Sequence, residues 1–228
     1  MWNLANDLVS KLGEGCELRR RADFSDIETI RSLEGRDVGS FQAFGGGKLE
    51  KVAIARLSFA PGAEYNYVHF MPLPCYRIPD YVCEGMSMAE GTSFSLDLYP
   101  PVDLVTEPEH FAEYRERLEL TYRAATARFT WKPSEIAWAR AAASPYFFMA
   151  SAPAEQKPAV LELAMAYFDA WLDIYRQAER VGPEVERAMR RRREHWTEGL
   201  LTSDPNVGRV AQILGEELTS RLAQAMLA

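Results

Sequence analysis

The chain is poor in residues that bind metals or form cross-links. Among its 228 residues there are three cysteines, Cys16, Cys75 and Cys83. An odd number of cysteines without zinc-type spacing argues against a disulfide framework or a structural zinc site. The three histidines, His69, His110 and His195, fall in separate segments, so the sequence predicts no metal centre. We expect Cys75 and Cys83 to be reduced residues of the core or of a site wall.

Motifs that bind nucleotides are also missing. The sequence has neither Gly-x-Gly-x-x-Gly after a strand nor Gly-x-x-x-x-Gly-Lys-Ser/Thr. The run Gly45-Gly46-Gly47 is most simply a connection between two strands. A redox enzyme with this sequence is therefore not expected to bind its own nucleotide cofactor in a familiar way.

Long hydrophobic runs and an excess of positive charge are absent as well. No apolar run approaches the roughly 20 residues needed to span a bilayer, and the first residues show no secretory or transit pattern. The net charge of -7 argues against a general nucleic-acid binder. The 47% hydrophobic and 26% charged content is typical of a soluble globular protein, and we expect a cytoplasmic one without membrane or nucleic-acid partners.

Strands are predicted in the first half of the chain, after two short helices at 2–12 and 25–34. Five runs of strand character follow one another, with glycine or proline in the connections: 36–44, 48–59, 65–71, 81–86 and 93–99. The last two form a hairpin that turns at Glu90-Gly91. Such a meander makes an antiparallel sheet with two faces to cover.

Helices dominate the second half. Helical spacing of apolar residues is found in 107–125 and 155–180, with a short strand at 146–150 between them. Gly182-Pro183 starts a further helix, and a last one begins at Ser203-Asp204-Pro205. The pattern predicts a single α/β domain over residues 1–228, a three-layer α/β/α sandwich with a central antiparallel sheet flanked by helices.

The hairpin carries the residues with the clearest chemical potential. Because side chains alternate along a strand, Glu84 shares its face of the strand with Val82 and Met86. Asp97 shares its face with serines and a tyrosine. A carboxyl group among apolar neighbours has a raised pKa and can act as a proton donor near neutral pH. The alternative is that Glu84 reaches solvent at a strand end or pairs with a buried arginine.

These residues stand in motifs that resemble a known family. The segment Phe70-Met-Pro-Leu-Pro-Cys-Tyr-Arg-Ile-Pro79, followed by Glu84 and by Asp97-Leu-Tyr-Pro100, resembles the strand and hairpin of the ferredoxin-dependent bilin reductases. The stretch Ser203-Asp-Pro-Asn-Val-Gly-Arg-Val-Ala-Gln-Ile-Leu-Gly-Glu-Glu217 resembles their closing helix. Three other segments, 96–105, 138–145 and 171–173, are closer to red chlorophyll catabolite reductase, a plant member of the same superfamily.

The resemblance implies a sandwich that binds an open-chain tetrapyrrole between its sheet and its C-terminal helices. It implies reduction of that substrate with electrons from ferredoxin, and no bound flavin, metal or nicotinamide. Glu84 matches the position of a catalytic carboxylate on the hairpin strand, and Asp204 matches a second acidic position near the C-terminus. Biliverdin and a chlorophyll-derived bilin both remain open as the substrate, and heme oxygenase is a candidate upstream supplier.

The chain departs from the family pattern at two positions. The phycocyanobilin-forming reductases have a catalytic histidine where this chain has Tyr67, and a glutamate where it has Ala55 or Arg56. Their four-electron chemistry is therefore not expected here, and a two-electron reduction is favoured. His69 is a candidate substitute for the missing histidine, or a strand histidine that is simply hydrogen-bonded in place.

Further site residues are expected from segment position. Tyr67, Met86, Met88 and Phe94 are candidate walls of the substrate site, and Asp97 is expected to orient the hairpin there. Arginine pairs well with carboxylates, so Arg140 and Arg209 are candidate partners of the substrate's propionates.

Basic runs are the candidate docking sites for ferredoxin, which is acidic. The chain has two such runs, Arg19-Arg20-Arg21 and Arg190-Arg191-Arg192-Arg193. The second is expected to be the docking site, and the alternative for both is a solvated helix face.

The sequence thus predicts a ferredoxin-dependent reductase of a linear tetrapyrrole, with Glu84 and Asp204 as its acidic pair. A non-catalytic tetrapyrrole carrier or chaperone of the same fold is the main alternative. A third possibility is a sandwich protein whose carboxylates are purely structural.

Overall fold

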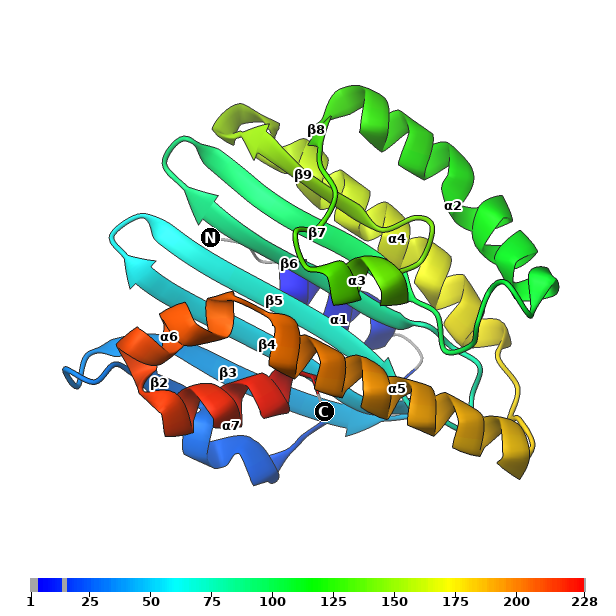
Figure 1. Ribbon diagram of the computed structural model, residues 1–228, viewed down its shortest axis with the longest axis horizontal. Coiled ribbons are helices and arrows are strands. Elements are labelled where there is room, and N and C mark those ends of the chain that lie inside the picture. The colour runs from blue at the N-terminus through cyan, green and yellow to red at the C-terminus, as the bar shows by residue number, and fades with distance from the viewer. Residues whose placement is uncertain (1–3, 14–15, 228) are drawn as a thin grey trace.

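A nine-stranded antiparallel sheet forms the centre of the molecule (Figure 1). The computed structural model describes residues 4–13 and 16–227. The strands are β1 (Arg19–Arg20), β2 (Thr29–Arg31), β3 (Asp37–Gly46), β4 (Leu49–Ala60), β5 (Ala63–Pro72), β6 (Asp80–Met88), β7 (Gly91–Tyr99), β8 (Thr130–Trp131) and β9 (Phe148–Pro153). Their order is β1-β3-β4-β5-β6-β7-β9-β8, and β2 pairs with β3. The five predicted strands form the continuous meander β3 to β7, so this prediction is confirmed.

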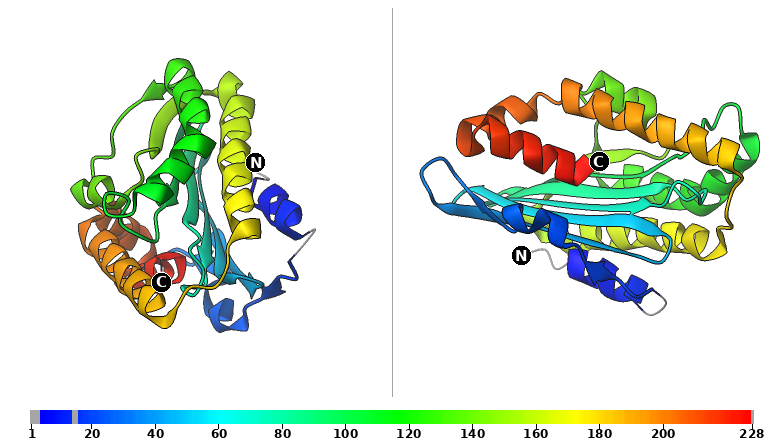
Figure 2. Two further views of the ribbon diagram at one scale, coloured as in Figure 1. Left: turned by 90° about the vertical axis from the view of Figure 1, so that its right-hand side faces the viewer. Right: turned by 90° about the horizontal axis from the view of Figure 1, so that it is seen from below.

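Helices cover both faces of the sheet. They are α1 (Leu4–Gly13), α2 (Pro108–Arg128), α3 (Ala137–Ala142), α4 (Lys157–Gln177), α5 (Pro183–Ser203), α6 (Asn206–Leu214) and α7 (Glu216–Leu227), with short 3₁₀ helices η1 (Ala22–Ile27) and η2 (Ala154–Gln156). Figure 2 shows α1 and α4 on one side of the sheet and α5, α6 and α7 on the other. The predicted α/β/α sandwich is confirmed. No helix in the described part of the chain has the length and apolar character needed to cross a membrane.

The α4 side holds the larger core. The stripe of apolar residues in α4 is buried against strands β4 to β7 and β9, together with side chains of α1 and α2. Its centre is aromatic: the Phe168 ring stacks on Trp171 at 5.2 Å, and Phe70 lies 5.0 Å from Phe168. The indole N–H of Trp171 donates to the Pro79 carbonyl at 2.8 Å. This side therefore fixes the start of β6 by packing and by a buried hydrogen bond.

The opposite side is more polar and carries the C-terminal helices. Its smaller core includes Phe41, Tyr67 and Val82 from the sheet, and Leu214 and Leu222 from α6 and α7. Along β5, β6 and β7, every second side chain points to the core on the α4 side, and the side chains between them point to this opposite side. Glu84, His69 and Asp97 are among them because of that alternation.

Two predicted helices differ from the structure. Residues 25–34 form the end of η1 and the strand β2 instead of a helix, because Ile30 is fully buried where β2 pairs with β3. The last predicted helix is split at Gly215, whose φ of 84° lies in the left-handed region that favours glycine. This break turns α7 back onto the sheet.

Candidate active site

Glu84 lies in the middle of β6 with its carboxyl group held by two hydroxyl groups. The Tyr65 hydroxyl donates to Oε2 at 2.7 Å, and the Ser95 hydroxyl donates to Oε1 at 2.9 Å. Glu84 is half-buried, and it faces Tyr67 on β5 and Ser95 on β7 in the register of the sheet. The expectation of apolar surroundings was wrong, because cross-strand neighbours and not the residues of the same strand surround this carboxyl group.

Asp204 follows α5 and is half-buried. Its Oδ1 accepts the backbone N–H of Asn206 at 2.8 Å at the start of α6, so Asp204 caps that helix. Burial is the main cause that raises the pKa of Tyr65 well above its ordinary value, followed by Glu84, and then by Tyr67 and Asp204. Both predicted acidic residues therefore contribute to the electrostatic surroundings of one tyrosine.

Asp97 is the carboxyl group with a raised pKa. Burial raises its pKa to about 6, against the opposing effect of hydrogen bonds from Ser144 and Leu98. Its Oδ2 accepts the Ser144 backbone N–H at 2.9 Å, and its Oδ1 accepts the Ser144 hydroxyl and the Leu98 backbone N–H. Asp97 thus ties the segment after α3 to β7, and the orienting role expected for it in a substrate site stays a prediction.

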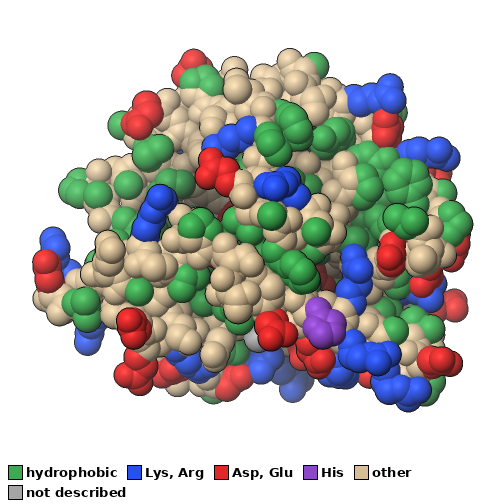
Figure 3. Space-filling model, viewed as in Figure 1, with side chains coloured by type: hydrophobic (Ala, Val, Ile, Leu, Met, Phe, Trp, Pro, Cys, Tyr) green, Lys and Arg blue, Asp and Glu red, His purple; other side chains and the backbone are tan. Residues whose placement is uncertain are grey.

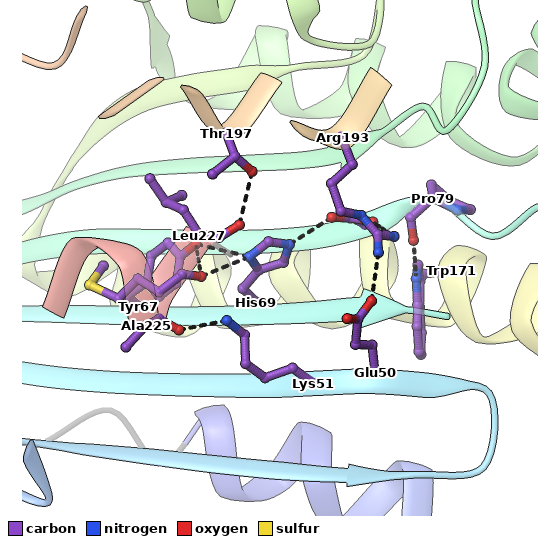
Figure 4. Close-up of polar contacts among 12 residues, drawn as sticks. Glu50, Lys51, Tyr67, His69, Pro79, Trp171, Arg193, Thr197, Ala225 and Leu227 are labelled. Carbon is purple, nitrogen blue, oxygen red and sulfur yellow. Dashed lines mark hydrogen bonds and ion pairs between the residues drawn. The ribbon is translucent and has the colours of Figure 1, made fainter. Parts of the chain in front are cut away.

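His69 is completely buried in a hydrogen-bonded network on the same face (Figure 4). Its Nε2 lies 2.9 Å from Asp80 Oδ2, and its Nδ1 lies 3.1 Å from both the Tyr67 hydroxyl and the Met226 carbonyl. Arg193 of α5 donates to Asp80 Oδ1 at 2.9 Å. The strand histidine is therefore fixed from both sides, and it links the sheet to α5 and α7.

The end of α7 is bound to the sheet and to α5 through its last carbonyl groups. Lys51 donates to the Ala225 carbonyl at 2.7 Å, and Thr197 donates to the Leu227 carbonyl at 3.0 Å (Figure 4). Burial lowers the pKa of Lys51 to about 8. Because helix C-termini leave carbonyl groups without partners inside the helix, these donors satisfy them and hold α7 in place.

A cavity of about 370 Å³ opens between α3, α5 and the ends of β6 and β7. Its lining residues come from β6, β7, α3, α5 and the segment after β7: Asp80, Tyr99, Pro100, Pro101, Trp138, Ala141, Ala142, Met189, Arg192, Arg193, His195 and Trp196. Figure 3 shows this face of the molecule hollowed between the α3 segment and the helices α5 and α6. The cavity has a size typical of small-molecule sites.

The remaining predicted substrate residues are distributed unevenly. Met86 is half-buried on the Glu84 face, and Met88 is exposed at the end of β6. Phe94 is buried on the opposite side against Phe129 and Phe148, so its assignment to the same site is corrected. The reason is the strand alternation, which places Phe94 and Ser95 on opposite faces.

The two arginines expected to bind propionates do not line the cavity. Arg140 of α3 is exposed and donates to the Ser134 carbonyl, and Arg209 of α6 is exposed beside Asn206. Neither residue belongs to this cavity, and their propionate-binding role stays a prediction.

The basic run of α5 is divided between surface and interior. Arg190 and Arg191 are exposed, whereas Arg192 and Arg193 are half-buried and line the cavity. Arg193 pairs with Asp80 and Glu50. Four consecutive helical residues point in different directions, so only the first two remain candidates for docking ferredoxin.

Comparisons with known proteins agree with this architecture. The model of the ferredoxin-dependent bilin reductase family matches residues 8–227. The chain belongs to this family.

A solved structure of the same fold is the crystal structure of phytochromobilin synthase from tomato in complex with biliverdin. The TM-score is 0.89 at 14% sequence identity, and the match covers 99% of this chain and 81% of that chain. No curated protein matches the chain. The likeness of single motifs to red chlorophyll catabolite reductase stays a prediction.

Several residues around Glu84 and the cavity were not predicted from the sequence as parts of a site: Tyr65, Ser95, Asp80, Tyr99 and Trp196. Arg192 was predicted on the surface as a docking residue, and it lines the cavity instead. The hairpin turn was predicted one residue too late, at Glu90-Gly91, and this error concealed Ser95 as the cross-strand partner of Glu84. Met88 pairs with Gly91, so the turn residues are Ala89 and Glu90, and counting back from them places Ser95 opposite Glu84.

One cluster of metal-ligand residue types lies away from this site. Ligand atoms of Glu107, Glu109 and His110 at the start of α2 lie within 4.8 Å of one another. The Arg77 guanidinium already sits among them, 2.6 Å from His110 Nε2 and 3.2 Å from Glu107. A guanidinium in this position neutralises the acidic groups that would attract a cation.

Proposed function

We propose that this protein reduces a linear tetrapyrrole with electrons supplied by ferredoxin. The family match and the fold shared with a biliverdin complex support this proposal. The observation that carries it is the half-buried Glu84, fixed by two hydroxyl groups on the sheet face that the C-terminal helices cover.

In the proposed reaction the protein mainly supplies protons. Ferredoxin transfers one electron at a time, and a conjugated tetrapyrrole can hold that electron as a delocalised radical. A two-electron reduction then consumes two electrons and two protons. A general acid must lie within hydrogen-bond distance of the accepting atom, and it contributes roughly a hundredfold or more to the rate.

Glu84 is the first proton donor in this scheme, and it takes up from solvent the proton that it delivers to the reduced pigment. The Tyr65 and Ser95 hydroxyl groups fix its side-chain rotamer, and its half-buried position leaves it accessible to a ligand on this face. A fixed acid needs no rearrangement when the radical forms. Tyr65 keeps its own proton, because burial and the neighbouring carboxylates raise its pKa.

Asp204 is the second acidic residue of the proposed site. It is half-buried at the junction of α5 and α6, and its charge adds to the causes that raise the pKa of Tyr65. In this position it can hold the pyrrole nitrogens as a hydrogen-bond acceptor or deliver the second proton.

The two departures from the phycocyanobilin-forming reductases favour a two-electron product. Tyr67 is buried, and burial raises the pKa of its phenol well above the ordinary value. Ala55 has no titratable group. The same departures favour a carrier that binds the pigment without reducing it, as the second candidate function.

Anaerobic mixing with biliverdin tests both functions. We expect a shifted visible spectrum on binding, followed by loss of the biliverdin band when ferredoxin, ferredoxin reductase and NADPH are added. Mass and absorbance of the product would identify the reduced bond. A shifted spectrum that stays constant under reducing conditions would support the carrier, and an unchanged spectrum on mixing would overturn both.

A further inference from the structure

Glu84 is held by hydroxyl groups from both neighbouring strands. Ser95 of β7 lies directly opposite Glu84, whereas Tyr65 of β5 lies opposite Met86 and reaches Glu84 diagonally. Each hydroxyl donates to a different carboxylate oxygen, Tyr65 at 2.7 Å and Ser95 at 2.9 Å. No basic residue in the described part of the chain forms a hydrogen bond or an ion pair with Glu84. The two hydroxyl groups are therefore its polar side-chain partners.

A second phenol on the same face of β5 has a different partner. Tyr67 lies directly opposite Glu84 in the register, but its hydroxyl donates to the Met226 carbonyl at 3.2 Å and lies 3.1 Å from His69 Nδ1. Tyr67 therefore holds α7, and Tyr65 holds Glu84. The two tyrosines form a matched pair, because both lie on one face of one strand and only one of them binds the carboxyl group.

The other titratable groups of this layer do not supply Glu84 with a positive charge. Basic residues from β4, β5 and α5 lie at other groups: Lys51 at the Ala225 carbonyl, Arg192 at the Pro100 carbonyl, His69 and Arg193 at the Asp80 carboxylate, and His195 at the cavity. Acids and phenols come from β5, β6, β7 and the junction of α5 and α6: Tyr67, Cys83, Asp97, Tyr99 and Asp204. The hydrogen bonds from Tyr65 and Ser95 favour the ionised form of Glu84, because a carboxylate accepts more strongly than a neutral carboxyl group.

Tyr65 remains a donor when Glu84 changes its protonation. Burial, and after it Glu84, raises the pKa of the Tyr65 phenol well above its ordinary value. A carboxylate has about four lone-pair sites. Tyr65 and Ser95 fill two of them, and no described residue donates to the others. A proton on a remaining site displaces neither hydroxyl, but it weakens both hydrogen bonds, because they then end on a neutral group.

We propose that the Tyr65 hydroxyl is a positioning group that sets the pH at which Glu84 holds the proton it delivers, with Ser95 as its counterpart on β7. This inference rests on the proposed function, and it adds a residue that acts through Glu84 and not on the pigment itself. In the transfer step the O–H bond of Glu84 breaks, and the proton passes to the pigment that ferredoxin has reduced by one electron. The carboxylate that remains regains two charge-assisted hydrogen bonds, so Tyr65 favours release of the proton.

Single turnovers of biliverdin with pre-reduced ferredoxin, between about pH 5 and pH 9, test this role. The rate should fall as the pH rises and Glu84 loses its proton. In Tyr65→Phe, which keeps the ring, the pH of half-maximal rate should rise by roughly 0.5 to 1, because the ionised form loses a charge-assisted hydrogen bond. Ser95→Ala should shift this pH in the same direction. The affinity of both variants for biliverdin, measured from the visible spectra, should equal that of wild-type protein.

Tyr67→Phe is the matched control. It removes the phenol that binds α7, so its pH of half-maximal rate should equal that of wild-type protein, whatever the rate itself. In the Glu84→Gln background, Tyr65→Phe should leave the pH profile unchanged, because glutamine has no proton to lose.

Two results would overturn the inference and leave the proposed function intact. One is an unchanged pH of half-maximal rate in folded Tyr65→Phe and Ser95→Ala. The other is an equal shift in Tyr67→Phe, which would show that any hydroxyl lost from this face has the same effect. If wild-type protein binds biliverdin and does not reduce it, the proposed reduction and this inference fall together.

Discussion

The Nε2 atom of His69 lies 2.9 Å from the Oδ2 atom of Asp80, and both side chains are almost completely buried. Burial alone would raise the pKa of Asp80, but Arg193 and His69 together hold it below its ordinary value. An ionised Asp80 therefore joins β5, β6 and α5 in the layer that also carries the proposed site.

Removing this charge should destabilise the fold. Asp80→Asn leaves Arg193 and His69 without their buried anion, and we expect a loss of about 3–5 kcal/mol in the free energy of unfolding. The control Asp37→Asn removes an exposed pair with Arg31 and should cost below about 1 kcal/mol. Urea unfolding of the two variants measures both values. Similar losses in the free energy of unfolding would contradict a larger contribution from the buried charge of Asp80 than from the exposed charge of Asp37.

Asp97 should make stability depend on pH. Its pKa of about 6 in the folded protein lies above the ordinary value of 3.8, so its contribution to stability is present at low pH and is lost as the pH rises through about 6. Relative to Asp97→Asn, wild-type protein should gain about 2 kcal/mol in the free energy of unfolding at pH 4 compared with pH 7. Denaturant titrations of both proteins at the two pH values measure this difference. The same pH dependence of the free energy of unfolding in wild-type protein and in Asp97→Asn would contradict the prediction.

Glu84→Gln should separate binding from turnover. Glutamine keeps the size of the side chain, and its carbonyl oxygen can accept from one hydroxyl group while its NH2 group donates to the other, so biliverdin binding should persist. Loss of the general acid should slow ferredoxin-driven reduction at least roughly a hundredfold. Glu90→Gln, at the exposed hairpin turn, is the matched control. Wild-type turnover in Glu84→Gln would remove this residue from the mechanism.

Gly199 should be intolerant of a side chain. A Cβ atom at this position would overlap the indole of Trp138, which packs across α5 and donates to the Trp196 carbonyl at 3.2 Å. We expect Gly199→Ala to cost about 1–3 kcal/mol by displacing α3. In the double variant with Trp138→Ala the two effects should not add, because the second change removes the clash. Additive losses would indicate that α3 and α5 do not meet here.

Charge reversal on α5 tests the ferredoxin surface. Arg190→Glu with Arg191→Glu should raise the KM for ferredoxin by roughly tenfold at low salt and much less at high salt, because exposed charges are screened. The same change at Arg19 and Arg20, on the other basic run, is the comparison. If only the charge reversal at Arg19 and Arg20 alters the salt dependence of the KM for ferredoxin, ferredoxin docks at β1 and not on α5.

The fold could be predicted because its signals are local. Glycine and proline mark the ends of the meander strands, and the apolar stripe of α4 has helical period. The segment 25–34 could not be predicted, because pairing with β3 outweighs its helix-start signal. The break between α6 and α7 depends on Gly215. The apolar residues on both sides of this glycine follow one helical pattern, so the pattern does not show the break.

The site could be predicted only in part, because much of it depends on contacts between segments that are distant in the sequence. Glu84 and Asp204 followed from family motifs, and both contribute to the raised pKa of Tyr65. Their surroundings depend on cross-strand register and on which face of α5 turns inward. A shift of one residue in the hairpin turn changes the partner of Glu84, and Arg191 and Arg192 differ in exposure although they are adjacent.

The two sides of the sheet differ in what holds them. Stacked aromatic rings secure α4, while buried polar pairs and carbonyl contacts secure α5 and α7. A substitution on the α4 side therefore disturbs the close packing of rings, whereas a substitution on the α5 side leaves a buried polar group without its partner.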